Sequence, residues 1–242
     1  IEEIPDNSLV IFSAHGVSSE VEEQTKARNL NFFDATCPLV TKVHMEVRKH
    51  ANANKDIILI GHEGHPEVEG TMGRHINSEN SSIFLVQNEG DAKNISILKK
   101  NNLALVTQTT LSVDETKSII KILKDRFPKI EVPKKDDICY ATQNRQDAVK
   151  QLALESDYMI VVGSKNSSNS NRLKELGEKC GCDSVLIDEF SDLNLEDLKN
   201  CKNISITAGA SAPESRVMEI AKSLENYFDA KLVESGHDNE DV

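Results

Sequence analysis

One pattern of apolar and polar residues recurs along the chain. A short run of aliphatic or β-branched residues comes first, a small polar loop follows, and an amphipathic helical stretch comes next. The apolar runs lie at residues 9–12, 57–60, 103–106, 158–162 and 204–206. Continuous apolar strands that alternate with helices are typical of parallel sheets covered on both faces. The pattern therefore predicts an α/β fold.

The helices carry their own start and stop signals. Ser112 and Glu115 form a capping box before the apolar positions of a helix, and Pro128 ends that helix. Three further prolines follow polar loops, and we expect them in the first turn of a helix, where a missing N–H is tolerated: Pro38, Pro66 and Pro213. The unusual residues thus lie where loops join helices.

Changes in composition predict how the chain divides. The charged run at 133–137 has the character of a solvated linker, and a second break is expected near Cys37. We expect the remnant of a first α/β domain at 1–37, a second α/β domain at 38–134, a third at 135–228 and a polar tail at 229–242. The remnant is too short to hold a core alone.

Composition then narrows the class of function. The 242 residues include 28 Lys and Arg against 40 Asp and Glu, a net charge of −12 that argues against unspecific binding to nucleic acid or anionic membranes. Aromatic residues make up only 4% and Trp is absent, so little material is present for base stacking. No apolar run reaches the roughly 20 residues of a membrane span. We expect neither a nucleic-acid nor a membrane partner.

The chain has five cysteines, an odd number without a tight spacing pattern. This usage fits a reducing compartment better than a secreted protein. We expect a cytoplasmic protein. The sequence shows no charged-then-apolar secretory leader. A plastid is the alternative compartment, because the sequence begins at Ile1 rather than Met and its N-terminal residues are expected to be missing.

The polar loops after the apolar runs are rich in Ser, Thr, Asn, His and Gly and poor in Lys and Arg. In open parallel sheets, ligands bind beyond the carboxyl ends of the strands, where helix N-termini offer free N–H groups. Five such loops favour an anion held by neutral donors, backbone amides and one or two histidines. The alternative is that these residues only cap helices.

His62, His65 and Glu67 lie in and just after the loop that follows residues 57–60. No HExxH spacing or paired CxxC supports zinc. Two histidines and a glutamate at the end of a strand favour proton transfer and anion contact over purely structural roles. Glu67 can relay a proton if burial raises its pKa.

Cys37 and Cys139 each come directly before a predicted helix. Isolated cysteines are often buried apolar residues, but a thiolate at a helix N-terminus is stabilised and suits an iron–sulfur ligand. Two ligands do not hold a cluster, so a third is expected from outside this chain or from residues upstream of Ile1. We interpret the other three as packing residues: Cys180, Cys182 and Cys201.

Seven short motifs lie along the chain: FSAHGVS at 12–18, DATCPLV at 34–40, GHEGHPEVEGT at 61–71, TQTTLS at 107–112, DICYAT at 137–142, GSKNSSNSN at 163–171 and TAGASAP at 207–213. These motifs resemble those of the 4-hydroxy-3-methylbut-2-enyl diphosphate reductases, which act last in the methylerythritol phosphate route to isoprenoids. All seven occur in the family's order. The chain is therefore identified as a member of that family by resemblance.

The resemblance implies three small parallel-sheet α/β domains around a pseudo-threefold axis, the first largely missing. It implies a 4Fe-4S cluster with one cysteine from each domain, of which Cys37 and Cys139 are two. The family's first cysteine and its first active-site histidine have no counterpart in this sequence, so the third ligand is expected upstream of Ile1.

The resemblance also implies roles for individual residues. Glu67 corresponds to the proton-relay residue, Thr109 to a polar partner beside it, and Thr110 is adjacent. The residues that correspond to diphosphate contacts are His15, His65, Ser167, Ser168, Asn169 and Ser211.

The implied reaction is a reductive dehydroxylation of the allylic diphosphate to isopentenyl and dimethylallyl diphosphate. A ferredoxin or flavodoxin is the implied electron donor. Two alternatives remain at this point. One is another three-cysteine iron–sulfur enzyme, similar to quinolinate synthase, and the other is an inactive phosphometabolite-binding fragment. The Ser-Ser-Asn and Thr-Gln-Thr-Thr loops suit a diphosphate better than a dicarboxylate.

Overall fold

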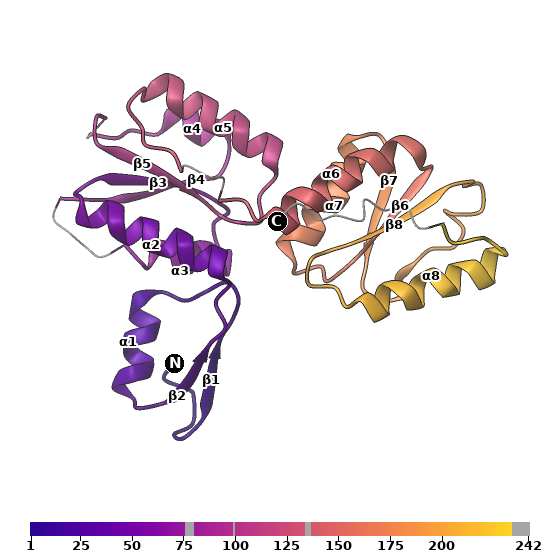
Figure 1. Ribbon diagram of the computed structural model, residues 1–242, viewed down its shortest axis with the longest axis horizontal. Coiled ribbons are helices and arrows are strands. Elements are labelled where there is room, and N and C mark those ends of the chain that lie inside the picture. The colour runs from indigo at the N-terminus through magenta and orange to yellow at the C-terminus, as the bar shows by residue number, and fades with distance from the viewer. Residues whose placement is uncertain (76–79, 99, 134–136, 234–242) are drawn as a thin grey trace. The chain divides into compact units, whose positions relative to one another are not determined.

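The computed structural model describes residues 1–75, 80–98, 100–133 and 137–233. It contains three small parallel sheets with helices between the strands, as the apolar pattern predicts (Figure 1). Contacts divide the described chain into two units. The first comprises Ile1–Thr109 and Asp114–Ile138, and the second comprises Thr110–Val113 and the chain from Cys139 on. The predicted division into three domains stays a prediction.

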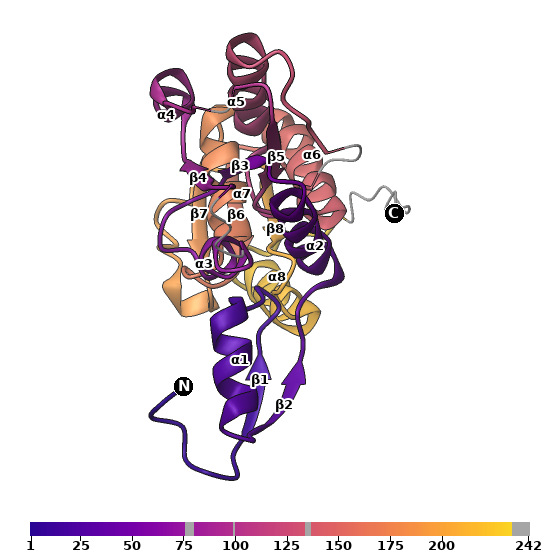
Figure 2. The same ribbon diagram turned by 90° about the vertical axis from the view of Figure 1, so that its left-hand side faces the viewer.

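The first unit contains two sheets. Strands β1 (Leu9–Phe12) and β2 (Asn31–Asp34) pair in parallel, and helix α1 (Ser19–Ala27) lies beside them (Figure 2). The second sheet has the order β4-β3-β5, with strands β3 (Asp56–Ile60), β4 (Ile83–Val86) and β5 (Leu103–Thr107). Its helices are α2 (Pro38–Asn52), α3 (Pro66–Met72), α4 (Glu89–Asn94) and α5 (Val113–Arg126).

The second unit repeats this plan. Its sheet has the order β7-β6-β8, with strands β6 (Tyr158–Val162), β7 (Asp183–Ile187) and β8 (Ile204–Ala208). The helices are α6 (Tyr140–Glu155), α7 (Ser168–Lys179) and α8 (Glu214–Phe228), with a short 3₁₀ turn at Phe190–Asp192.

The central strands are buried on both faces, which explains their continuous apolar sequence. Every residue of β3 is buried. Ile57 and Leu59 pack with residues of α2 and α3, while α4 and α5 lie on the other side of the sheet (Figure 1). In β6, Met159 packs toward α6 and α7, and Ile160 packs toward α8. Successive side chains of a strand point to opposite faces of the sheet, so each central strand contributes to the hydrophobic core on both faces.

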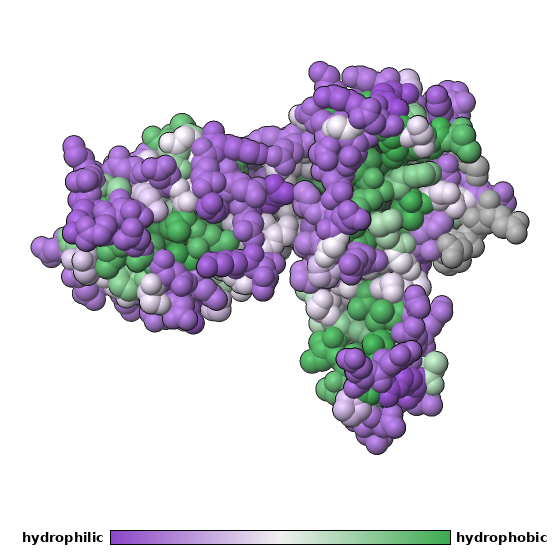
Figure 3. Space-filling view, turned by 180° about the vertical axis from the view of Figure 1, so that it is seen from behind, coloured by the Kyte–Doolittle hydropathy of each residue, from purple (hydrophilic) through white to green (hydrophobic). Residues whose placement is uncertain are grey.

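The first sheet differs from the other two. Leu9, Ile11 and Phe33 are each more than three-fifths exposed. The alternate side chain Phe12 is buried and stacks on Phe32. The space-filling view shows hydrophobic residues at the surface of the lobe that this sheet forms (Figure 3). One face of this sheet is therefore without helix cover among the described residues.

Two local expectations differ from the structure. Pro38 and Pro66 begin α2 and α3 as predicted, but Pro213 is the N-cap of α8, which starts at Glu214, because its backbone is extended (ψ 134). Asp137 is buried rather than part of a solvated linker, and residues 134–136 of that run lie outside the described residues. Of the predicted tail, 234–242 also lie outside them. No described helix is long and apolar enough to span a membrane.

Candidate functional site

The polar loops gather at one edge of each sheet because paired parallel strands end together. In the first unit, Phe12 pairs with Asp34 and Ile60 with Thr107. In the second unit, Val162 pairs with Ala208. The predicted site residues other than Cys139 lie in the loops that follow these strands or in the first turn of the next helix, and Cys139 is the N-cap of α6. The carboxyl ends of the strands are therefore the candidate ligand-binding edge of each sheet.

His65 is the N-cap of α3. Its Nδ1 accepts a hydrogen bond of 3.1 Å from the backbone N–H of Glu67, so the neutral ring carries its proton on Nε2. Burial, together with the charges of His15 and His62, lowers the pKa of His65 to about 4. Near neutral pH, His65 is thus an uncharged ring with one N–H to donate.

Glu67 lies in the first turn of α3 and is only 1% exposed. The backbone N–H of Thr109 donates to Oε1 at 2.6 Å, and Thr109 Oγ1 donates to Oε2 at 3.1 Å. Burial raises the pKa of Glu67 to about 7, against the lowering effect of the Thr109 hydrogen bonds, and the charge of Asp137 raises it further. This carboxyl group can both hold and release a proton near neutral pH.

His15 lies beside His65 in the loop after β1. The two rings meet edge to face with centroids 5.4 Å apart. The backbone N–H of Cys37 donates to the carbonyl of Ala14 at 3.0 Å, which brings the start of α2 to the same loop. Within the first unit, the structure therefore brings together His15, His65, Glu67 and Thr109, with Cys37 nearby.

Three residues at this edge were not predicted. Gln108 is buried, and its Oε1 accepts from the backbone N–H of His62 at 3.1 Å. Asp137 pairs with Lys42 at 3.1 Å and accepts from the N–H of Thr107. Burial is the main reason that the pKa of Asp137 is raised. The charged run at 133–137 predicted a solvated position for Asp137. A glutamine after a strand does not by itself predict a role in a site.

The third unpredicted residue is His44 of α2. It is buried, its Nε2 has no hydrogen-bond partner among the described residues, and burial lowers its pKa to about 4. Gly16 lies against the ring of His44 and has a positive φ of +73. A methyl group at Gly16 would lie 2.5 Å from His44 Cε1. The turn after His15 thus needs a glycine. A single histidine on a helix gives no sequence signal for such a contact.

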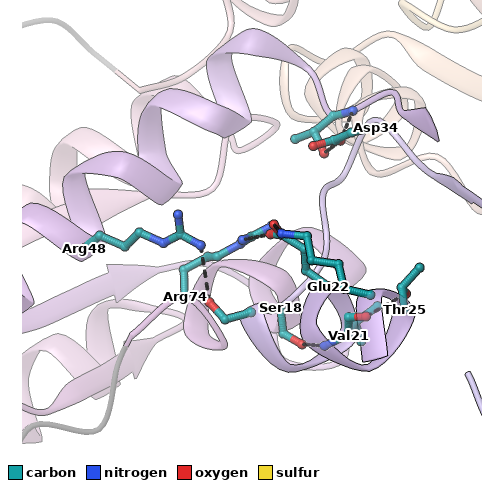
Figure 4. Close-up of polar contacts among 10 residues, drawn as sticks. Ser18, Val21, Glu22, Thr25, Asp34, Arg48 and Arg74 are labelled. Carbon is teal, nitrogen blue, oxygen red and sulfur yellow. Dashed lines mark hydrogen bonds and ion pairs between the residues drawn. The ribbon is translucent and has the colours of Figure 1, made fainter. Parts of the chain in front are cut away.

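A buried arginine connects α1 to the end of α3 (Figure 4). Arg74 donates to Glu22 at 2.6 Å, and Arg48 donates to Ser19 at 3.4 Å. Hydrogen bonds from Lys26 and then Arg74 lower the pKa of Glu22 to about 2. The Arg74 contact holds α1 against the end of α3, the helix that contains Glu67, and the Arg48 contact holds α1 against α2.

In the second unit, the first turn of α7 holds three predicted residues. Ser167 is the N-cap and accepts from the N–H of Ser170 at 3.3 Å. Ser168 is in hydrogen-bond contact with Thr110 (3.3 Å). Asn169 is 5% exposed, and neither its Oδ1 nor its Nδ2 has a partner among the described residues. A buried amide without partners is costly, so this site is suited to a polar ligand. Ser211 lies in the exposed loop after β8.

The two units share a repeat in which Cys37, His65 and Glu67 each correspond to a residue 102 positions later. Cys37 corresponds to Cys139 (139 − 37) as the N-cap of α2 and α6. His65 corresponds to Ser167 (167 − 65) as the N-cap of α3 and α7. By the same offset, Glu67 corresponds to Asn169. The same backbone position thus carries a proton-exchanging group in one unit and an amide in the other.

The two corresponding cysteines have nearly the same backbone, with φ −56 and ψ 133 at Cys37 and φ −58 and ψ 134 at Cys139. Neither side chain caps its helix by a hydrogen bond, and both residues are partly exposed. Cysteine sulfur is the soft ligand that iron–sulfur clusters take from proteins. Each of these residues, taken singly, has the chemistry of an iron–sulfur ligand, and among the described residues no group of three His, Cys, Asp or Glu could hold a metal ion.

The other cysteines do not share this geometry. Cys182 is buried in the core of the second unit, where its Sγ contacts the carbonyl of Ser156 at 3.5 Å. Cys180 is the C-cap of α7, at the end remote from Asn169. Cys201 Sγ contacts the carbonyl of Asp197. Of these three, Cys182 alone is buried in a core, whereas Cys180 is exposed and Cys201 is partly exposed.

The LytB protein family matches residues 1–225. The 4-hydroxy-3-methylbut-2-enyl diphosphate reductases of Saccharophagus degradans and Alcanivorax borkumensis are 57% and 56% identical to this chain over 93% of its length, and it covers 72% and 73% of theirs. The structure of the E-1-hydroxy-2-methyl-but-2-enyl-4-diphosphate reductase from Plasmodium falciparum matches with a TM-score of 0.87 and 39% identity, over 93% of this chain and 70% of that one. By both sequence and fold, the chain belongs to the LytB family.

Proposed function

We propose that this protein is a 4-hydroxy-3-methylbut-2-enyl diphosphate reductase. Membership of the LytB family and the names of its relatives support this activity. In the proposed reaction, the allylic C–O bond breaks, two electrons and two protons are taken up, and the hydroxyl leaves as water. A C–H bond forms at either end of the allyl group, which yields isopentenyl or dimethylallyl diphosphate.

The observation that carries the proposal is the buried pair of Glu67 and Thr109. A carboxyl group with a pKa of about 7 is suited to deliver a proton at neutral pH. Thr109 holds both of its oxygens in place. Glu67 therefore supplies the proton that converts the departing hydroxyl to water, and Thr109 orients it.

The diphosphate is bound by neutral donors. In the first unit, His65 offers its Nε2–H beside His15. In the second unit, Ser167 and Ser168 lie with the buried amide of Asn169 in the first turn of α7, and Ser211 follows β8. Neutral donors at a helix N-terminus bind phosphate oxygens without the clustered lysines that this acidic chain lacks.

Cys37 and Cys139 would hold a 4Fe-4S cluster together with a third cysteine from outside the sequence. Such a cluster, when bound, would supply the two electrons of the reduction. A ferredoxin or flavodoxin, which carries single electrons, is the proposed donor. The chain's own residues bind and orient the diphosphate and provide the proton.

The test is anaerobic turnover of the reconstituted holoenzyme with a chemical reductant. Because a general acid contributes about 10²-fold or more, Glu67→Gln should lower kcat by at least that factor while the KM for the substrate changes little. Glu69→Gln, an exposed neighbour on α3, is the matched control and should retain full turnover. Turnover of Glu67→Gln within twofold of wild type would remove Glu67 from the proton path. An iron-free protein that binds pyrophosphate but never turns over would instead be a binding module.

A further inference from the structure

Ser170 is a fully buried residue whose hydroxyl has no hydrogen-bond partner among the described residues. Its Oγ lies against two glycines at the carboxyl ends of neighbouring strands. A methyl carbon built at Gly163 would lie 2.3 Å from this oxygen, and one built at Gly209 would lie 2.1 Å from it. Shape rather than hydrogen bonding thus accounts for a small residue here.

The backbone of each glycine is hydrogen-bonded to a neighbouring strand of the sheet. The N–H of Gly163 donates to Ile187 of β7 at 2.8 Å, and the N–H of Gly209 donates to Val162 of β6 at 2.9 Å. Ser170 therefore fixes how closely the first turn of α7 approaches both strand ends. At the corresponding place in the first unit, Gly61 contacts Val68 of α3, but Gln108 stands where the second unit has Gly209.

Within the described ranges of the chain, the side-chain amide of Asn169 has no hydrogen-bond partner that could orient it, so its position depends on the backbone turn beside it. We propose that the contact of Ser170 with Gly163 and Gly209 positions Asn169 and Ser168 for the diphosphate, which makes Ser170 a positioning residue. This inference rests on the proposed function, because the ligand is the diphosphate of that reaction. If the first turn of α7 is displaced outward, the side chains of Ser168 and Asn169 lie too far from their binding positions for the diphosphate.

The geometry predicts which substitutions disturb the turn and which restore it. A methyl group at Gly209 would collide with Ser170 Oγ but would lie 3.3 Å from Ser170 Cβ. Removing the hydroxyl with Ser170→Ala should therefore relieve Gly209→Ala. At Gly163, the corresponding distance to Cβ is 3.0 Å, so the same second substitution should relieve Gly163→Ala less completely.

A matched control exists at the other end of the same helix. A methyl carbon at Gly177 would lie 2.3 Å from Ser184 Oγ, which is the same type of contact far along α7 from Asn169. Gly177→Ala should lower thermal stability as Gly209→Ala does. It should leave the anion-binding turn in place, because only the last turns of α7 must shift.

The experiment is titration calorimetry of the full chain with inorganic pyrophosphate, with melting temperatures measured alongside. We expect Gly209→Ala to raise the Kd on the order of tenfold. We expect Gly177→Ala to keep the wild-type Kd, and the double variant Gly209→Ala with Ser170→Ala to recover a Kd within about threefold of wild type. A wild-type Kd for Gly209→Ala, an equal loss for Gly177→Ala, or no recovery in the double variant would each overturn the inference.

A second measurement does not depend on binding. The side-chain amide resonances of Asn169, assigned by their loss in Asn169→Ala, should shift in Gly209→Ala, return in the double variant and stay unchanged in Gly177→Ala. Unshifted resonances in Gly209→Ala would overturn the positioning role. If wild type binds no pyrophosphate while these resonances shift as expected, the proposed function fails and the positioning role stands.

Discussion

At the residue scale, the hydrogen bond from Thr109 Oγ1 to Glu67 stabilises the ionised carboxylate and so lowers its pKa. Thr109→Val removes this donor, and the pKa of Glu67 should rise above about 7. Because a proton donor must be protonated to act, the alkaline limb of the kcat profile should move to higher pH. The measurement is kcat between pH 6 and pH 9 on the reconstituted holoenzyme.

The control for this prediction is Thr109→Ser, which keeps the hydroxyl and should leave the alkaline limb in place. A limb that moves to lower pH in Thr109→Val would contradict the assignment of Glu67 as the acid. A general loss of rate with an unmoved limb would show that Thr109 acts on packing alone.

At the element scale, the N-caps of α7 and α1 are both serines that accept a backbone N–H. Ser167 accepts from Ser170 and Ser18 accepts from Val21. Replacing either one by Ala should lower the free energy of unfolding by about 1 kcal/mol. Only Ser167→Ala should also weaken pyrophosphate binding, because Ser18 lies on a helix without a predicted ligand contact. Urea unfolding and calorimetry measure the two effects, and equal binding by both variants would exclude Ser167 as a ligand.

The contact between α1 and α3 should depend on pH through Glu22. Its pKa of about 2 lies below its ordinary value of 4.5, so its ion pairs stabilise the fold above pH 4.5 and are lost as the pH falls toward 2. Glu22→Gln should therefore unfold at lower urea concentration than wild type at pH 7, and the difference should shrink with acid. The exposed neighbour Glu20→Gln should show much less effect. An equal loss in both variants would mean that the pair with Arg74 adds nothing.

At the scale of the whole molecule, each unit has one N-cap cysteine of the same backbone geometry. Cys37→Ser and Cys139→Ser should each remove most of the iron bound after anaerobic reconstitution, because each takes away a proposed thiolate ligand. Cys201→Ser, whose thiol contacts a backbone carbonyl, should retain the iron of wild type. Iron and acid-labile sulfide analysis measures this. Full iron content in the double variant of Cys37 and Cys139 would exclude them as ligands.

Much of this protein follows from local sequence. Apolar runs without alternation predict buried parallel strands, and β3, β5 and β6 are such strands. Prolines after polar loops locate the starts of α2 and α3. Ordered short motifs identify the family, because each carries several residues of one site on a contiguous stretch. Short-range rules suffice for these features, since each depends on neighbours in the chain.

Other features depend on residues that are distant in sequence. Glu67 has a pKa of about 7 only because α3 buries it against Thr109, 42 positions later. Asp137 belongs to a charged run, yet Lys42 and Thr107 bury it. The unpartnered amide of Asn169 and the contact of Ser170 with two glycines likewise exist only after the strands have paired. Desolvation and close packing arise from the folded chain as a whole. Residue types and spacing therefore predict which loops carry the chemistry, and only the tertiary structure decided the proton affinity of Glu67 and the shape of the turn at Ser170.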